Sequence, residues 1–237
     1  MTGCVQRRAL LAFLLAAAIP CVADWQSASE AMGRRLGQFS AYLDQAFRKR
    51  DGGFAGAKDK LAVIVAGKKA GTGFILRTDD GCWLYTNAHV VGDASPDDVR
   101  ATLLNNTTLT LGACQRAQGR DLVRFALVGP LPAFVPERNV PDIGEPIAIL
   151  GNSDGRGVVT EIRGRILGVG PQELEVDAPF VAGNSGSPVL NRAGRVVGVA
   201  SYLRNCRDNA DWSKRNTRYN GIRRFALRLS GIRWAAR

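Results

Sequence analysis

The chain has 237 residues, of which 46% are hydrophobic, and a formal net charge of +11. This length and apolar content suffice for one large or two small cores. The chain has one histidine, His89, and no Cys-x-x-Cys spacing, which argues against a zinc site, and no metal or other cofactor is expected. Residues 204–237 hold ten basic side chains against two aspartates, so nearly all of the excess positive charge is C-terminal.

The first 23 residues have the pattern of a removable signal peptide. Two arginines precede the apolar run 9–19, and residues 21–23 end in the small side chains that signal peptidase accepts. The run is short for a bilayer span, which favours export over a membrane anchor. We therefore expect a mature chain that begins at Asp24 and acts in the periplasm or outside the cell.

Cleavage at this point leaves three cysteines, Cys82, Cys114 and Cys206. An exported protein meets oxidising conditions, which allow one disulfide, and the odd number then leaves one thiol over. The spacing does not indicate which pair would form.

Residues 24–60 form an N-terminal extension with one predicted helix. Between Ala31 and Phe47 the apolar residues recur at intervals of four, three, four and four, as on one face of an amphipathic helix. We expect this helix to pack on the domain that follows. Control of access to a site, or contact with a partner, is the alternative.

From residue 61 the pattern changes to short apolar strands separated by turn residues, which predicts an all-β barrel or sandwich. Five of the ten prolines lie between Gly129 and Pro146, and proline cannot donate to a central ladder. We therefore expect a first β unit over 61–130, an extended connector over 131–145 and a second β unit over 146–237. The predicted strands are Leu61–Ala66, Gly73–Arg77, Cys82–Thr86, Leu103–Leu111, Leu122–Val128, Pro146–Leu150, Val158–Ile162, Leu174–Val176, Val189–Leu190 and Val196–Tyr202.

The C-terminal segment fits two predictions. One is a strand over Tyr219–Phe225 followed by a short helix over Leu227–Trp234. The other is a single helix with one apolar face, because the spacing of the apolar residues between 222 and 232 also fits a helical period. The spacing alone does not separate them.

A histidine and a serine stand in motifs typical of nucleophilic catalysis. A serine hydroxyl needs a base to take its proton, and the base needs an acceptor on its other ring nitrogen. His89 follows a predicted strand in Thr86-Asn87-Ala88-His89-Val90-Val91. Ser185 lies in Gly183-Asn184-Ser185-Gly186, where small residues let the backbone turn tightly and present its amides. We predict that His89 is the base and Ser185 the nucleophile.

Asp121 is the predicted acid that orients His89. It stands at the start of the strand-like run 121–127, so its carboxylate would lie at the mouth of a buried strand. Asp97 and Asp98 follow His89 so closely that the chain would have to fold straight back, and Asp142 lies in the connector. Elimination therefore leaves Asp121.

With Gly71-Thr72-Gly73-Phe74-Ile75 before them and Gly198-Val199-Ala200-Ser201 after them, these motifs resemble the trypsin-like peptidase family. Its bacterial HtrA-type and glutamyl-endopeptidase-type branches are the nearest. The resemblance covers residues 61–232 and implies a chymotrypsin-like fold of two antiparallel β-barrels with the triad in the cleft between them. HtrA-type proteins usually add a PDZ domain, for which we expect no room here.

The resemblance also implies roles for the residues around the nucleophile. The backbone amides of Gly183 and Ser185 would form the oxyanion hole. Substrate-binding residues would be Pro179 and Phe180 in the primary specificity pocket, and Ala200, Ser201 and Tyr202 on the strand beside the extended substrate.

Three departures from the family pattern bear on activation and specificity. Asn184 stands where animal enzymes have an aspartate that pairs with a freed N-terminus, so activation by that ion pair is not expected. Ala200 occupies the position of the specificity histidine of glutamyl endopeptidases, and Pro179 supplies no charge. We therefore expect small or apolar side chains before the scissile bond, at the P1 position.

Two functions follow from these patterns. The first is an exported serine endopeptidase acting on protein or peptide substrates through His89, Asp121 and Ser185. The alternative is a catalytically silent trypsin-like module that binds an anionic surface through residues 204–237. Nucleic acid is not expected as a partner, because the basic residues are not interleaved with aromatic ones in the manner of RNA-binding domains.

Overall fold

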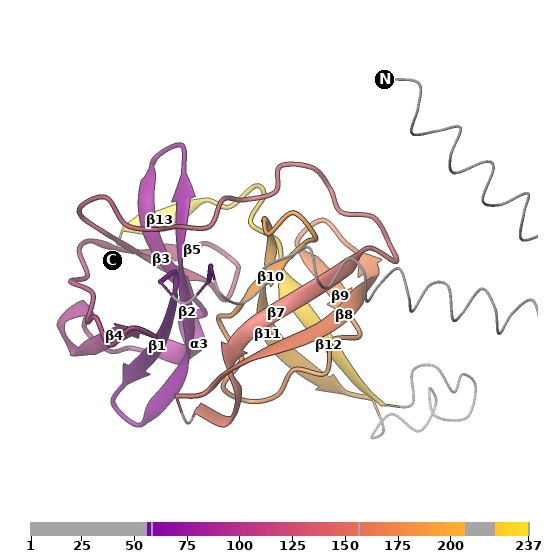
Figure 1. Cartoon of the computed structure of the whole chain (residues 1–237), viewed down its shortest axis with the longest axis horizontal. Coiled ribbons are helices and arrows are strands. Elements are labelled where there is room, and N and C mark those ends of the chain that lie inside the picture. Colours follow the sequence, from indigo (N-terminus) through magenta and orange to yellow (C-terminus); the bar gives the residue numbers. More distant parts are fainter. Residues whose placement is uncertain (1–55, 58, 156, 207–220, 237) are drawn as a thin grey trace, which may run out of the picture. The chain divides into compact units, whose positions relative to one another are not determined.

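The computed structural model of the protein describes residues 56–57, 59–155, 157–206 and 221–236 (Figure 1). The expected signal peptide, the helix expected over 31–47 and residues 207–220 of the basic segment lie outside this part of the chain. Two groups of antiparallel strands make up most of the regular secondary structure of the described residues, so the all-β prediction is confirmed. No helix among them is long and apolar enough to cross a membrane.

Six strands of the C-terminal half close into a barrel (Figure 1). Around the barrel the order is β10-β11-β12-β9-β8-β7, and neighbouring strands are antiparallel. Closure leaves no unpaired edge and encloses an apolar interior. The strands are β7 (Pro146–Asn152), β8 (Val159–Val169), β9 (Glu173–Val176), β10 (Pro188–Leu190), β11 (Val196–Asn205) and β12 (Ile222–Leu227).

Seven strands form the other sheet, in the order β13-β5-β6-β3-β2-β1-β4. They are β1 (Leu61–Ala66), β2 (Lys69–Thr78), β3 (Gly81–Thr86), β4 (Val99–Leu103), β5 (Cys114–Ala117), β6 (Val123–Ala126) and β13 (Trp234–Ala236). The described residues also hold one turn of α-helix, α3 (Ala88–Val91), and two 3-10 turns, η1 (Pro96–Asp98) and η2 (Ser153–Gly155).

The strand predicted over Leu103–Leu111 is wrong, because the chain turns inside it. The Leu103 N–H donates to the Thr107 carbonyl (2.8 Å), and the Asn106 N–H donates to the Leu103 carbonyl (2.9 Å). Asn106 has a φ of 67°, a left-handed conformation that asparagine adopts more readily than most residues. The apolar run therefore belongs to the end of β4 and to the segment after the turn.

The C-terminal segment contains strands and not the predicted helix. β12 pairs with β9 and β11, residues 228–233 belong to no regular element, and β13 pairs with β5 of the first sheet. Leu229, Ile232 and Trp234 pack against the apolar cluster between the two strand groups. The apolar spacing thus reflects an extended segment that crosses back to the first sheet, beyond the 61–130 range expected for that unit.

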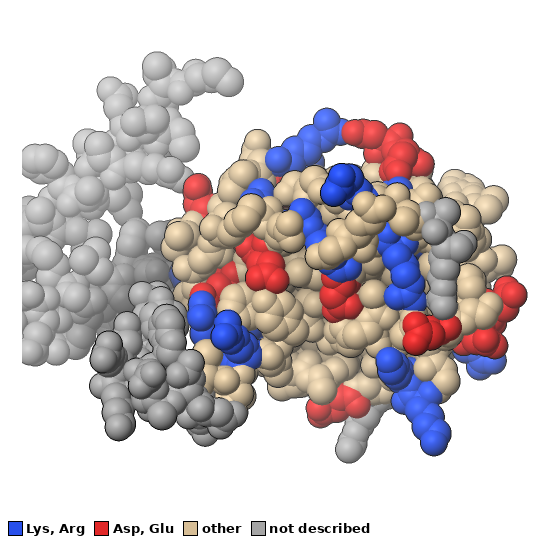
Figure 2. All heavy atoms as spheres, turned by 180° about the vertical axis from the view of Figure 1, so that it is seen from behind, with Lys and Arg blue, Asp and Glu red and all other residues tan. Residues whose placement is uncertain are grey.

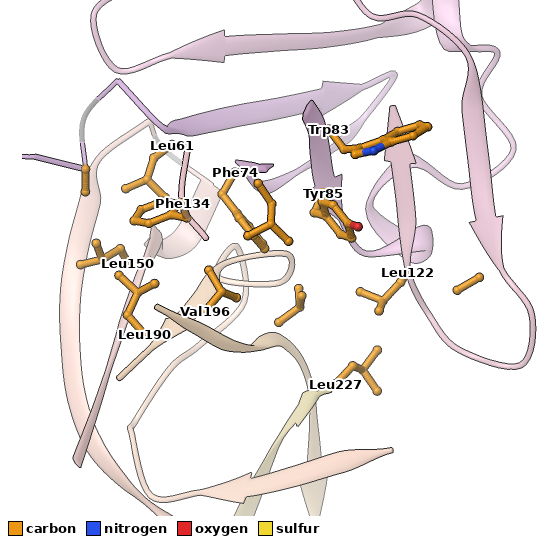
Figure 3. Close-up of a cluster of buried hydrophobic side chains, with 14 residues drawn as sticks. Leu61, Phe74, Trp83, Tyr85, Leu122, Phe134, Leu150, Leu190, Val196 and Leu227 are labelled. Carbon is orange, nitrogen blue, oxygen red and sulfur yellow. The ribbon is translucent and has the colours of Figure 1, made fainter. Parts of the chain in front are cut away.

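Three apolar cores hold the molecule together. One lies within the first sheet around Ile75 and Phe125, and one lies within the barrel around Ile149 and Phe180. The third joins the two groups of strands (Figure 3). Its labelled members come from both sides and from the connector: Leu61, Phe74, Trp83, Tyr85, Leu122, Phe134, Leu150, Leu190, Val196 and Leu227.

Strand β2 is buried on both faces. Phe74 and Leu76 belong to the cluster between the strand groups, whereas Ile75 belongs to the core of the first sheet, and all three side chains are 0% exposed. Successive side chains of a strand point to opposite faces, so a strand between two cores is apolar at every position. This explains the unbroken run Phe74-Ile75-Leu76 in an antiparallel sheet.

A buried arginine attaches the C-terminal strand to the first sheet. The Arg124 guanidinium lies 3.8 Å from the ring centre of Trp83 and 4.4 Å from that of Trp234. Its charge is paired with Asp80 (Nη2 to Oδ2, 2.7 Å), although the arginine is only 5% exposed. Two aromatic faces and one carboxylate therefore replace water around this cation.

Removal of the Trp234 ring should loosen this attachment. We expect Trp234→Ala to lower the free energy of unfolding by about 2 kcal/mol, less than for a fully buried tryptophan because this one is only partly buried. Denaturant unfolding checks the value. Ile222→Ala on exposed β12 surface is the control, expected to change stability by less than about 0.5 kcal/mol. An equal, small change in both variants would contradict a stabilising role for β13.

Candidate active site

The register between β3 and β6 brings His89 to Asp121. Thr86, the last residue of β3, lies opposite Val123, the first residue of β6. Just beyond these strand ends the two backbones are still adjacent, and the Ala88 N–H donates to the Asp121 carbonyl (3.4 Å). The chain then turns into α3, which places the His89 ring beside the Asp121 carboxylate.

Three hydrogen bonds converge on the Asp121 carboxylate. Oδ1 accepts from the His89 backbone N–H (2.8 Å), and Oδ2 accepts from His89 Nδ1 (2.5 Å) and from the Ser201 hydroxyl (3.0 Å). Burial alone would raise the pKa of this carboxyl, but the donors of His89 and Ser201 hold the pKa of Asp121 below its ordinary value. The carboxylate is therefore ionised at neutral pH.

The ionised Asp121 fixes the tautomer of His89. A carboxylate only accepts hydrogen bonds, so the hydrogen of the neutral ring lies on Nδ1 and the lone pair on Nε2. The His89 side chain is 49% exposed, against 34% for Asp121. The His89 ring is thus the more exposed of the two groups and carries a free lone pair on Nε2, while the less exposed Asp121 carboxylate holds the other side of the ring.

A β-bulge at Ser201 links Asp121 to Ser185. The pairing of β11 with β12 shifts between Ala200 and Tyr202, which leaves Ser201 as the extra residue and re-aims its groups. Its hydroxyl donates to Asp121, and its carbonyl accepts from the Ser185 hydroxyl (3.1 Å). In the described structure no hydrogen bond joins Ser185 to His89, and the hydroxyl of the predicted nucleophile is bonded to Ser201 instead.

The loop of Ser185 consists of two successive turns that need glycine. The Asn184 N–H donates to the Val181 carbonyl (3.1 Å), and the Ser187 N–H donates to the Asn184 carbonyl (3.0 Å). Gly183 and Gly186 have φ values of 87° and 86°. A Cβ on Gly183 would lie 2.3 Å from the Asn152 carbonyl oxygen, and one on Gly186 would lie 2.0 Å from that of Thr72. Both conformation and space therefore exclude a side chain here.

Thr72 connects this loop to the first sheet. The sequence did not indicate this role, although Thr72 lies in the motif Gly71-Thr72-Gly73-Phe74-Ile75. Its N–H donates to the Ser185 carbonyl (2.9 Å), and its carbonyl accepts from the Thr86 hydroxyl (2.7 Å). Its own hydroxyl donates to the Gly183 carbonyl (3.0 Å) and accepts from the Asn152 N–H (2.8 Å). All of its polar groups are used, and the residue is 0% exposed.

Asn87 is a second residue that the sequence reasoning did not single out. Its side-chain amide donates to the Asp121 carbonyl (2.8 Å) and to the Ser201 hydroxyl (3.2 Å). It is fully buried and holds the segment before His89 against the Asp121 backbone and against the Ser201 hydroxyl, which itself donates to the Asp121 carboxylate. Its position directly after β3 was the only sequence signal.

Asn184 closes the loop from within. It is fully buried, and its Oδ1 accepts from the Val181 N–H (2.9 Å). Its amide nitrogen lies 3.2 Å from the Ser153 hydroxyl. The neutral Asn184 side chain therefore holds the loop by hydrogen bonds. Animal enzymes have an aspartate at this position, which forms an ion pair with a freed N-terminus.

The residues expected to bind substrate lie in different environments. Ala200 and Ser201 are buried in β11, while Tyr202 is 38% exposed, and its ring lies 4.9 Å from that of Phe225. Pro179 is exposed, but the Phe180 side chain is 1% exposed and packs in the barrel core. In this structure the Phe180 ring is therefore part of the barrel core and does not line the surface of the site.

The described residues contain no group of three His, Cys, Asp or Glu side chains arranged to hold a metal ion. Among the described residues, Cys82, Cys114 and Cys206 form no disulfide with one another, and burial raises the pKa of the Cys82 thiol. The possible disulfide is not formed in this structure.

Comparison with known proteins gives consistent matches. Residues 71–199 match the trypsin-like peptidase domain. A probable periplasmic serine endoprotease, DegP-like, of Rhizobium meliloti is 33% identical over 148 residues, which cover 56% of this chain and 28% of that protein. A serine protease, HtrA-like, of Staphylococcus epidermidis is 28% identical over 155 residues, which cover 55% and 26%. The chain thus spans little more than a quarter of the length of these relatives.

Solved structures agree on the fold. The active form of a protease from M. tuberculosis superposes with a TM-score of 0.60 at 20% identity, covering 76% of this chain and 80% of that one. The serine endoprotease from Yersinia pestis gives a TM-score of 0.54 at 23% identity, covering 73% and 59%. These similarities confirm the expected two-barrel architecture.

The lowered pKa of Asp121 predicts how its contribution to stability depends on pH. A carboxylate with a depressed pKa stabilises the fold above its unfolded value, about 3.9, and loses this contribution as the pH falls through the lower folded value. We expect Asp121→Asn to be less stable than wild type at pH 7 and the difference to shrink below pH 4. Denaturant unfolding at both pH values measures it, with exposed Asp97→Asn as the control. A difference that stays constant with pH would contradict this.

Proposed function

Because the chain belongs to the trypsin-like peptidase family, we propose that it is an exported serine endopeptidase that acts through His89, Asp121 and Ser185. The observation that supports this most strongly is the geometry at Asp121. Three donors hold one carboxylate, and one of them is the only imidazole of the chain. This arrangement fixes a basic nitrogen beside a serine loop.

The first chemical step forms the acyl-enzyme. The Ser185 hydroxyl exchanges its bond to the Ser201 carbonyl for one to His89 Nε2, which takes the proton as Oγ attacks the scissile carbonyl. Asp121 stabilises the imidazolium that results. His89 then gives this proton to the leaving amine, and the peptide C–N bond breaks. A water molecule, deprotonated by the same ring, hydrolyses the ester and restores Ser185.

The Ser185 loop supplies the groups for the oxyanion. The backbone N–H groups of Gly183 and Ser185 donate to no oxygen among the described residues, whereas Asn184 N–H, which lies between them, is bonded to Val181. Two such donors aimed at the developing negative charge contribute roughly 3–4 kcal/mol each in related enzymes. Gly183 can present its amide because it tolerates a positive φ.

Export follows from the expected signal peptide over 1–23 and accords with the periplasmic relatives. We propose that the protein acts in the periplasm or outside the cell on protein or peptide substrates. None of the five residues that the sequence assigned to substrate binding is charged, which favours small or apolar P1 side chains.

The alternative of a silent module on an anionic surface gains no support from the described residues. Three arginines of the basic segment have partners within the barrel: Arg223 pairs with Glu175, Arg224 bonds the Phe180 carbonyl, and Arg228 bonds the Gly170 carbonyl. On the face that Figure 2 shows, basic and acidic side chains are interspersed.

A serine-directed phosphonate tests the proposed nucleophile. We expect the folded, mature protein to be labelled at Ser185, and Ser185→Ala to abolish labelling. His89→Ala should fold but lose peptidase activity by a factor on the order of 10⁶, because no second histidine can replace it. Peptide mapping of the adduct and circular dichroism provide the readouts. Folded wild-type protein that takes up no label would overturn the proposal.

Thr72→Val tests the hydroxyl that joins Gly183 to Asn152. The variant keeps the shape of the side chain but leaves the two backbone groups without their partner, so the oxyanion loop should shift. We expect kcat to fall by about 10²-fold with KM nearly unchanged, because the loop stabilises the transition state more than the bound substrate. Steady-state kinetics measure both constants. Thr110→Val, at an exposed position, is the matched control and should behave as wild type.

A further inference from the structure

A guanidinium lies beside the segment that resembles the wall of the primary specificity pocket. Arg224 of β12 is partly buried, and its Nε donates to the carbonyl of Phe180 (3.0 Å). Phe180 stands five residues before Ser185, in the segment that leads from β9 to the nucleophile. The cation therefore rests on the chain that carries the catalytic serine. Arg224 was not among the residues that the sequence assigned to substrate binding.

The alternation of β12 gives the direction of the Arg224 side chain. Its neighbours Arg223 and Phe225 lie on the outer face of the barrel, where Arg223 pairs with Glu175 (2.6 Å) and Phe225 stacks on Tyr202. Arg224 must point to the opposite face. That face is the barrel interior.

The inner position of Arg224 is confirmed by the next inward residue. Ala226 lies opposite Ala200 in the register, and both are fully buried in the barrel core. Two residues earlier on the same face, Arg224 lies opposite Leu203, where the core gives way to surface. It therefore stands at the open end of the barrel interior, next to the strand expected to hold the substrate backbone.

The charge of Arg224 has no counter-ion among the described residues. Its hydrogen bonds go to two neutral carbonyls, those of Phe180 and Ile222 (Nη1, 3.4 Å). The two carboxylates of β9 already have partners: Glu175 pairs with Arg223, and Glu173 accepts a hydrogen bond from the Tyr202 hydroxyl. A partly desolvated guanidinium without a carboxylate is a strong attractor for an acidic group.

We propose that Arg224 is a specificity-determining residue that selects an acidic side chain, aspartate or glutamate, at P1. The bond from Nε to Phe180 fixes the plane of the guanidinium and leaves N–H groups of Nη1 and Nη2 to bind the substrate carboxylate. The inference rests on the proposed peptidase function and replaces the small or apolar preference. It also assigns a role to one arginine of the basic segment.

Matched peptides that differ only in the charge at P1 test this directly. With wild-type protein, kcat/KM should be at least about tenfold higher for P1 glutamate than for glutamine, and for aspartate than for asparagine. Arg224→Gln should remove this ratio while cleavage after alanine persists. Arg223→Gln is the matched control: it loses the same charge one residue away on the outer face, and it should keep the ratio.

The outcomes separate the two proposals. Efficient cleavage after alanine or valine with equal rates for glutamate and glutamine would overturn the role of Arg224 and leave the peptidase function standing. Absence of both cleavage and phosphonate labelling would instead overturn the peptidase function. If Arg224→Gln does not fold, Arg224→Lys keeps the charge without the planar fork. It should retain a reduced preference for acids, and an unchanged preference would contradict the assigned geometry.

Discussion

The hydrogen bonds of Thr72 are the constraint on which the candidate active site depends. The proposed catalytic groups come from two separate strand systems, His89 and Asp121 from the first sheet and Ser185 from the barrel. Apolar packing is not directional, so it can bring these systems together without fixing a serine loop to a few tenths of an ångström. Thr72 supplies the missing direction, because its backbone and hydroxyl bond Ser185, Gly183 and Asn152 at once. Gly186 permits this contact, since any side chain there would strike the Thr72 carbonyl.

The cluster between the strand systems makes such polar bonds effective. Phe74 and Leu76 bury one face of β2 against the barrel, and Thr72 lies two residues before Phe74 on the same strand. Water is excluded from Thr72, so each unmade hydrogen bond there would cost roughly 1–3 kcal/mol. The apolar cluster and the hydrogen bonds of Thr72 therefore reinforce each other. The cluster excludes water, and the hydrogen bonds then favour a single conformation of the Ser185 loop. One consequence is that a polar substitution at Phe74, Ile75 or Leu76 would be buried in an apolar core, whichever face of β2 it is on.

The sequence predicted the parts of the site that local patterns encode. His89, Asp121 and Ser185 could be named because each stands at the end of a strand-like run or in a turn of small residues, and their order matches a known family. Phe180 was assigned to the pocket wall by position, but its ring points into the barrel core, because strand and loop direction depend on packing. Thr72, Asn87 and Arg224 were missed for one physical reason. Their partners lie far away in the chain, so only register and tertiary contact reveal what each side chain bonds.

The bulge at Ser201 is one local irregularity that bears on both the proposed catalytic residues and the proposed specificity residue. In a regular strand, Ser201 would face outward between two inward neighbours, Ala200 and Tyr202. The extra residue breaks this alternation: Ser201 turns to Asp121 and Ser185, and Tyr202 moves to the outer face against Phe225. With the Tyr202 ring outside, the inner face beyond Ala200 carries no aromatic side chain from β11. Arg224 then lies at this end of the barrel opposite Leu203 of β11, the strand whose bulge brings the Ser201 carbonyl to the proposed nucleophile.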